Sequence, residues 1–139
     1  MILIALPLVC SAQGSYAWLD ATEKQCVARY GKPQPADMAT LGSDKTIGYW
    51  KDEVHITADF VKGKCLRISY VCRDPVTQGQ IDTFFKANGG STAWAHFQGG
   101  GQGEYVRHDG LAKATVMIGY GGGVLFSKFC WDKAHDQAV

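Results

Sequence analysis

Two neighbouring segments of alternating hydrophobicity constrain the fold of this chain most. Residues 54–60 read Val-His-Ile-Thr-Ala-Asp-Phe and residues 65–72 read Cys-Leu-Arg-Ile-Ser-Tyr-Val-Cys, with a Gly63 turn between them. Because successive side chains of a strand point to opposite faces, each segment predicts a half-buried strand. In the second strand the expected inward face comprises Leu66, Ile68, Tyr70 and Cys72. Two such strands around a glycine turn predict an antiparallel hairpin.

The flanking segments predict an α+β fold. Helices are expected over residues 22–31, capped by Asp20 or Thr22, and over residues 76–87, capped by Asp74 or Thr77. Further strands are expected at residues 46–51, 92–98, 104–107, 111–120 and 124–131. The predicted architecture is two short helices packed on one face of a mainly antiparallel sheet.

The order of these elements is the same in both halves of the chain. Each half has a helix that starts near a threonine and ends near a glycine, followed by three or four strands. We therefore predict one domain over residues 18–139, built as a tandem α-β-β-β repeat. The two pseudo-repeats are residues 18–74 and 75–131, and residues 132–139 are a polar tail.

The N-terminal residues predict export. The apolar run of residues 2–10 is shorter than the roughly 20 residues that cross a bilayer as a helix. It is typical of a signal peptide, here residues 1–17, with cleavage after Ala12 or Ala17. Against this, no Lys or Arg precedes the run, and the bulky Val9 disfavours lipidation of Cys10. A periplasmic or extracellular location is expected, with no transmembrane segment in the mature chain.

Four cysteines remain after the predicted cleavage, namely Cys26, Cys65, Cys72 and Cys130. An even number in a small exported domain predicts two disulfides. The sequence leaves the pairing open: Cys26 is expected to bond either Cys65 or Cys72, with strand parity slightly favouring Cys72. A zinc site is disfavoured because the closest pair, Cys65 and Cys72, lacks the short ligand spacing of such sites.

Composition and motifs do not indicate catalysis or a cofactor. The net charge is +1, so no basic patch for nucleic acid is visible. The four histidines (His55, His96, His108 and His135) show no metal-binding spacing, and no G-x-S-x-G nucleophile motif occurs. The glycine run at residues 99–103 leads into a strand, whereas a phosphate loop leads into a helix. We predict no cofactor, no metal and no catalytic residue.

The sheet face turned away from the helices is the candidate site. Strand alternation places nine side chains there: Trp50, His55, Thr57, Asp59, Arg67, Ser69, Lys113, Thr115 and Met117. Tryptophan, arginine and methionine are enriched where proteins contact each other. This face predicts a surface that binds a protein partner, and the sequence predicts no oligomeric state.

The first half also resembles a known family. The Arg-Tyr-Gly-Lys-Pro stretch at residues 29–33, the strand bearing Trp50 and the Phe60 to Ile68 hairpin are similar to the BamE/SmpA family of small envelope proteins. The tandem arrangement resembles the β-lactamase-inhibitory protein fold. The similarity covers about a third of the chain and carries no functional residue across. It implies an exported module that binds proteins or envelope components without catalysis.

These observations predict an exported, non-catalytic protein-binding or inhibitor-like module. The alternatives are a small secreted hydrolase and a purely structural envelope protein. A hydrolase would need His96 or His108 to meet Glu104 or Asp109 in a cleft near the glycine run.

Overall fold

The computed structural model describes residues 19–35, 40, 42–89, 94–96 and 103–129. Within them the chain forms two helices and one eight-stranded sheet. In chain order the elements are α1 (Glu23–Tyr30), β1 (Gln34–Pro35), β2 (Lys45–Lys51), β3 (Val54–Val61), β4 (Lys64–Cys72), α2 (Gln78–Gly89), β5 (Trp94–His96), β6 (Glu104–Arg107), β7 (Ala112–Met117) and β8 (Gly123–Lys128).

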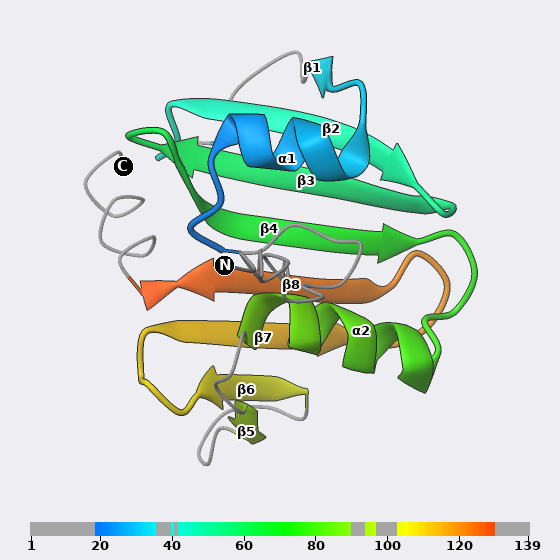
Figure 1. Cartoon of the computed structure of the whole chain (residues 1–139). Coiled ribbons are helices and arrows are strands. Elements are labelled where there is room, and N and C mark those ends of the chain that lie inside the picture. The colour runs from blue at the N-terminus through cyan, green and yellow to red at the C-terminus, as the bar shows by residue number, and fades with distance from the viewer. Residues whose placement is uncertain (1–18, 36–39, 41, 90–93, 97–102, 130–139) are drawn as a thin grey trace, which may run out of the picture.

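The sheet is antiparallel throughout, and both helices lie on one of its faces (Figure 1). The strand order is β1-β2-β3-β4-β8-β7-β6-β5, so the last strands of the two chain halves meet in the middle. This confirms the α+β prediction of two helices on one face of an antiparallel sheet. The strand order is compatible with a tandem repeat, which stays a prediction.

Both helices begin at a threonine that forms a capping box. The Thr22 hydroxyl accepts a hydrogen bond from the Gln25 amide, and the Gln25 side chain accepts one from the Thr22 amide. Thr77 and Gln80 repeat this exchange at α2. These reciprocal bonds satisfy donors that the first helical turn leaves free. The helix starts therefore follow from local sequence, as predicted.

A bulge in β4 corrects the predicted facing of that strand. The register passes from Asp59 opposite Arg67 to Phe60 opposite Cys65, which leaves Leu66 as an extra residue. An extra residue shifts the alternation by one position. Cys65 therefore shares the helix-covered face with Ile68, whereas Leu66, predicted to point inward, is only half-buried.

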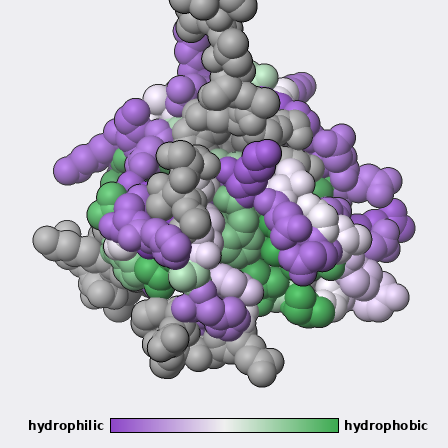
Figure 2. Space-filling model, turned by 60° about the horizontal axis from the view of Figure 1, so that its bottom comes forward, coloured by the Kyte–Doolittle hydropathy of each residue, from purple (hydrophilic) through white to green (hydrophobic). Residues whose placement is uncertain are grey.

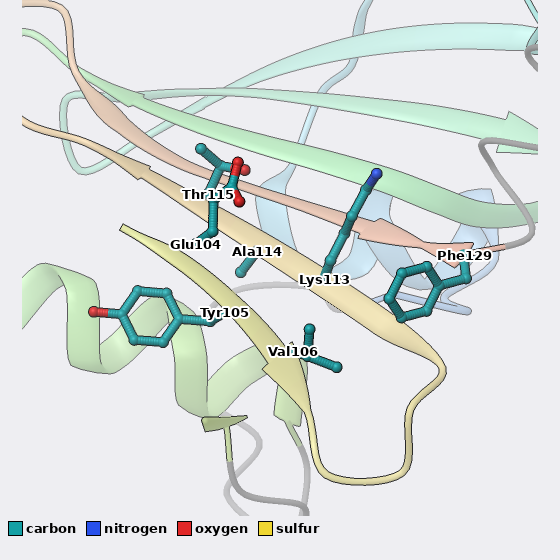
Figure 3. Close-up of a pocket in the computed structure, with 7 residues that line it drawn as sticks. All are labelled: Glu104, Tyr105, Val106, Lys113, Ala114, Thr115 and Phe129. Atoms are coloured by element: carbon teal, nitrogen blue, oxygen red, sulfur yellow. The ribbon is translucent and has the colours of Figure 1, made fainter. Parts of the chain in front are cut away.

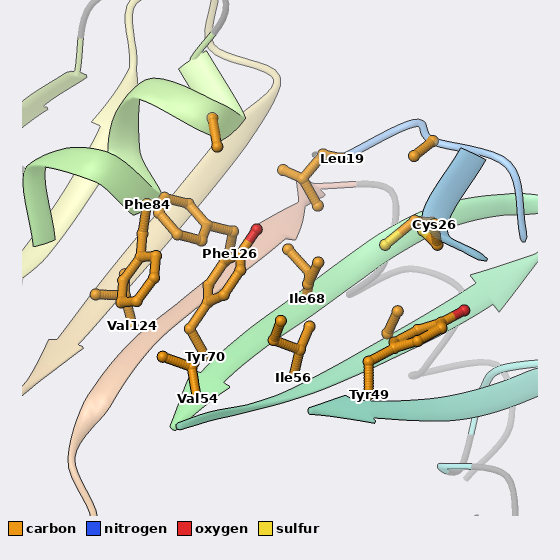
Figure 4. Close-up of a cluster of buried hydrophobic side chains, with 14 of the residues drawn as sticks. Leu19, Cys26, Tyr49, Val54, Ile56, Ile68, Tyr70, Phe84, Val124 and Phe126 are labelled. Atoms are coloured by element: carbon orange, nitrogen blue, oxygen red, sulfur yellow. The ribbon is translucent and has the colours of Figure 1, made fainter. Parts of the chain in front are cut away.

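The core lies between this face and the helices. Its centre is an aromatic cluster in which the Tyr70 ring stacks on Phe84 at 4.4 Å and meets the edge of Phe126 at 5.9 Å (Figure 4). The buried Asn88 side chain accepts a hydrogen bond from the Leu19 amide and donates to the Tyr70 hydroxyl. Asn88 thus links the chain entering α1 to α2 and the sheet.

Several expectations fall on residues outside those described. They include the signal peptide at residues 1–17, the glycine run at residues 99–102, Cys130 and the polar tail. Among the described residues, neither helix has the length and apolar character needed to cross a membrane.

Candidate binding surface

The sheet face opposite the helices carries all nine predicted site residues, because strand register aligns them in three cross-strand rows. We call this surface the open face. The first row is Trp50, His55, Val71, Gly123 and Met117. The second is Gly48, Thr57, Ser69, Leu125, Thr115 and Glu104. The third is Thr46, Asp59, Arg67, Ser127, Lys113 and Val106.

The first row has exposed apolar side chains at both ends and a glycine without a side chain between them. Trp50 is 54% exposed and lies against the His55 ring with 4.9 Å between ring centroids. At the other end Met117 is also exposed. Four strand spacings separate these ends, about 19 Å in all. Between them Gly123 has no side chain, and a Cβ there would overlap the Tyr70 carbonyl.

Asp59 corrects the prediction of an exposed acidic residue in the third row. Its side chain is on the predicted face but the residue is only 3% exposed. The Thr46 hydroxyl donates to Asp59 Oδ1 at 2.6 Å, and the Thr40 amide donates to Thr46 Oγ1 at 2.8 Å. The segment that includes Thr40 and Ser43 therefore covers this end of the row, and Asp59 acts as an internal acceptor. Arg67, with its Nε 4.0 Å from Asp59 Oδ2, remains about one-third exposed.

A hollow of about 230 Å³ lies over β6 and β7. Figure 3 shows Glu104, Lys113 and Thr115 on its walls, with Phe129 at one end. Glu104 and Lys113 place charges of opposite sign in one small depression of the open face. Such a depression can receive a polar side chain of a partner, because it offers both a donor and an acceptor.

The turn between β7 and β8 adds exposed apolar residues that the sequence pattern did not predict. The predicted strand 111–120 ends at Met117, and Ile118, expected to point inward, is 76% exposed. Tyr120 is 86% exposed. Gly119 and Gly121 have φ angles of 106° and 71°, which end the strand and turn the chain. These glycines were the signal that could have predicted the exposed turn.

The helix side of the sheet has a second depression. Two adjoining hollows of about 360 and 430 Å³ lie between α2 and the outer strands and share Gln78, Ile81 and Tyr105. With the β5–β6 edge turned forward, Figure 2 shows hydrophobic residues gathered in the middle of the surface and hydrophilic residues around them. This groove is separated from the open face by the sheet itself.

Two candidate residues of the predicted hydrolase, Asp109 and His96, make local contacts. Asp109 accepts hydrogen bonds from Arg107 Nε at 2.9 and 3.0 Å and from the Leu111 amide at 2.9 Å. The Arg107 hydrogen bonds lower the pKa of this carboxyl, which holds it ionised within a turn. His96 lies instead against the Tyr105 ring, with 4.7 Å between ring centroids. In the described ranges no group of three or more His, Cys, Asp or Glu side chains could hold a metal ion.

The three cysteines that the structure describes are buried, and no disulfide joins them. Cys26, Cys65 and Cys72 are free thiols. Cys72 follows Cys65 by seven residues of β4, about 23 Å at strand spacing. The predicted pairing of Cys26 with either of them is therefore not present in the structure, and the two candidates lie at opposite ends of one strand.

Comparison of the chain with protein-family models, curated proteins and solved structures finds no match.

Proposed function

We propose that this chain is an exported, non-catalytic module that binds a protein partner through the open face. The observation that carries the proposal is the first row of that face, with exposed apolar groups at both ends and Gly123 between them. Interfaces concentrate their binding energy in a few aromatic, arginine or apolar anchors surrounded by weaker polar contacts. Trp50 and Met117, the exposed residues at the two ends of the first row, have the character of such anchors.

The polar middle of the open face supports the same proposal. Thr57, Ser69 and Thr115 present hydroxyl groups along the second row, and Arg67 and Lys113 present donors in the third. Interfaces between separately folded proteins combine apolar contacts with direct hydrogen bonds, which these groups can form. A partner that covers about 19 Å of the first row would reach both apolar ends.

The export part of the proposal is supported by the apolar run at residues 2–10 and the small residues that follow it. Export is consistent with a binding module that acts outside the reducing cytosol. It does not depend on which partner is bound.

A capture experiment with surface variants tests the docking surface. We expect the double variant Trp50→Ala with Arg67→Ala to lose at least tenfold in affinity for the partner that wild type captures, because an anchor and a donor are removed together. Binding is measured by quantitative pull-down followed by titration of the captured protein.

Val27→Ala is the matched control, since Val27 is an exposed apolar residue on α1, in the helix layer. This control should bind like wild type. Equal capture by the double variant and by wild type would remove the open face from the proposal.

A further inference from the structure

Two thiols and a phenol share the buried space beneath α1. Cys26, Cys65 and Tyr49 are all completely inaccessible to solvent. The Tyr49 hydroxyl has no hydrogen-bond partner within the part of the chain that the structure describes. Burial is the main cause that raises its pKa, and negative charge on either cysteine raises it further. Both sulfur atoms therefore lie within electrostatic reach of this hydroxyl.

Backbone hydrogen bonds hold the start of α1 directly against Cys65. The Asp20 amide donates to the Cys65 carbonyl at 2.7 Å, and the Cys65 amide donates to the Ala21 carbonyl at 2.8 Å. α1 begins two residues after Ala21, and the Cys26 amide donates to the Thr22 carbonyl in its first turn. With a rise of about 1.5 Å per residue, Cys26 is only about 6 Å along the helix axis from Thr22.

Ion pairs flank this arrangement on both sides. Lys128 Nζ lies 2.7 Å from Asp20 Oδ2, and Lys45 Nζ lies 2.8 Å from Glu23 Oε1. The Leu66 bulge turns Cys65 to the helix-covered face. Cys26 is on the buried side of α1, which packs on that same face. The two thiols are thus brought together from elements that are 39 positions apart in the chain.

Cys72 does not belong to this cluster. It lies about 23 Å farther along β4 than Cys65, whereas a disulfide needs Cα atoms about 4.4–6.8 Å apart. Burial alone raises the pKa of Cys72. Burial is also the main cause that raises the pKa of Cys65, but negative charge on Cys26 raises it further. Cys72 faces the helix side with Ile68 and Tyr70, as strand parity predicted, but the Leu66 bulge turns Cys65 to the same face. Parity therefore does not distinguish the two candidates.

We propose that Cys26 and Cys65 are a redox pair that closes into a disulfide and ties α1 to β4. In the reaction the two thiols lose two protons and two electrons, and a low-molecular-weight disulfide such as glutathione disulfide is reduced to two thiols. The first thiolate attacks the oxidant to give a mixed disulfide. The second thiolate then displaces the remaining glutathione. This pairing goes beyond the proposed function and does not depend on it.

The burial of both thiols implies that the disulfide forms during folding. Burial raises the pKa of the Cys26 thiol to about 12 and that of Cys65 well above its usual value. The thiolate is the reacting form, and oxidant cannot reach an inaccessible sulfur. The bond therefore forms before α1 closes over the sheet, and the folded, reduced protein should react slowly.

Peptide mapping tests the pairing, because trypsin separates all four cysteines of the predicted mature chain. They fall in peptides 25–29, 65–67, 68–73 and 129–133. The full chain is unfolded, reduced and refolded in a buffer of reduced and oxidised glutathione, then alkylated and digested without reduction. We expect peptides 25–29 and 65–67 to appear mainly as one linked species that reduction splits.

Two variants sharpen the result. Cys72→Ser should retain the linked species, and Cys26→Ser should abolish it and leave peptide 65–67 unlinked to peptide 25–29. Recovery of both peptides of the refolded wild type in alkylated form would overturn the pairing. So would a link from peptide 25–29 to either peptide 68–73 or peptide 129–133.

Discussion

Replacing Phe126 with alanine should lower the free energy of unfolding by about 3–5 kcal/mol. Phe126 lies on β8, is completely buried and meets the rings of Tyr70, Phe85 and Trp94 edge-on at centroid distances of 5.9, 5.1 and 5.4 Å. The substitution removes a buried ring and leaves a cavity where the two halves of the sheet meet. Urea unfolding followed by circular dichroism measures the loss.

Tyr120→Ala is the control for this substitution. Tyr120 is an aromatic residue with 86% of its surface exposed, so its removal should change stability by less than about 0.5 kcal/mol. If Phe126→Ala were no less stable than Tyr120→Ala, the aromatic cluster would not be the centre of the core.

Asn88→Ala is expected to cost about 2–3 kcal/mol, since it leaves buried polar groups without partners. The Asn88 side chain accepts from the Leu19 amide at 3.0 Å and donates to the Tyr70 hydroxyl at 3.0 Å and the Phe84 carbonyl at 2.9 Å. Without this side chain the segment before α1 loses its tie to α2. Urea unfolding gives the energy, and hydrogen exchange of the Leu19 amide reports the local loss.

Gln78 offers a matched amide on the same helix. Its side chain donates to Asp82 at 2.8 Å on the exposed surface, where water replaces a lost bond. Gln78→Ala should therefore leave both stability and Leu19 exchange nearly unchanged. Unchanged exchange at Leu19 in Asn88→Ala would contradict the assigned linking role.

Local patterns predicted most of the fold because they act through neighbouring residues. The pairs Thr22 with Gln25 and Thr77 with Gln80 are three residues apart, and each forms its capping box. The alternation of residues 54–60 predicts the facing of β3 completely. The α+β architecture follows because two amphipathic helices and an alternating sheet bury their apolar sides against each other.

The incorrect predictions concern features that the spacing of residues in the sequence does not reveal. Leu66 is apolar on either face, so nothing in its identity reveals the bulge that turns Cys65 toward α1. Asp59 is on the predicted face but is buried by Thr46 and by a segment nearly twenty residues earlier in the chain. The short edge strand β1 was missed because two residues carry no periodicity.

For the candidate site, the sequence predicted which residues share a face of the sheet. It did not predict which of them are exposed and which are buried. All nine predicted residues align on the open face through strand register, since alternation alone determines this. The prominence of Ile118 and Tyr120 depends on where β7 ends, which Gly119 and Gly121 determine. Met117 at that end of the first row was predicted, whereas the exposed turn that follows it became apparent only with the structure.

Site-specific photo-crosslinking tests the proposed docking surface most directly. A photoreactive phenylalanine analogue is introduced at Thr57 or Ser69, which are neighbours in the second row, and at Thr83, an exposed position on α2. Irradiation in the native host should yield one discrete adduct from both open-face positions and none from Thr83, and Trp50→Ala should remove it. Adducts from Thr83 as abundant as those from Ser69, or no adduct from the open face, would contradict the account.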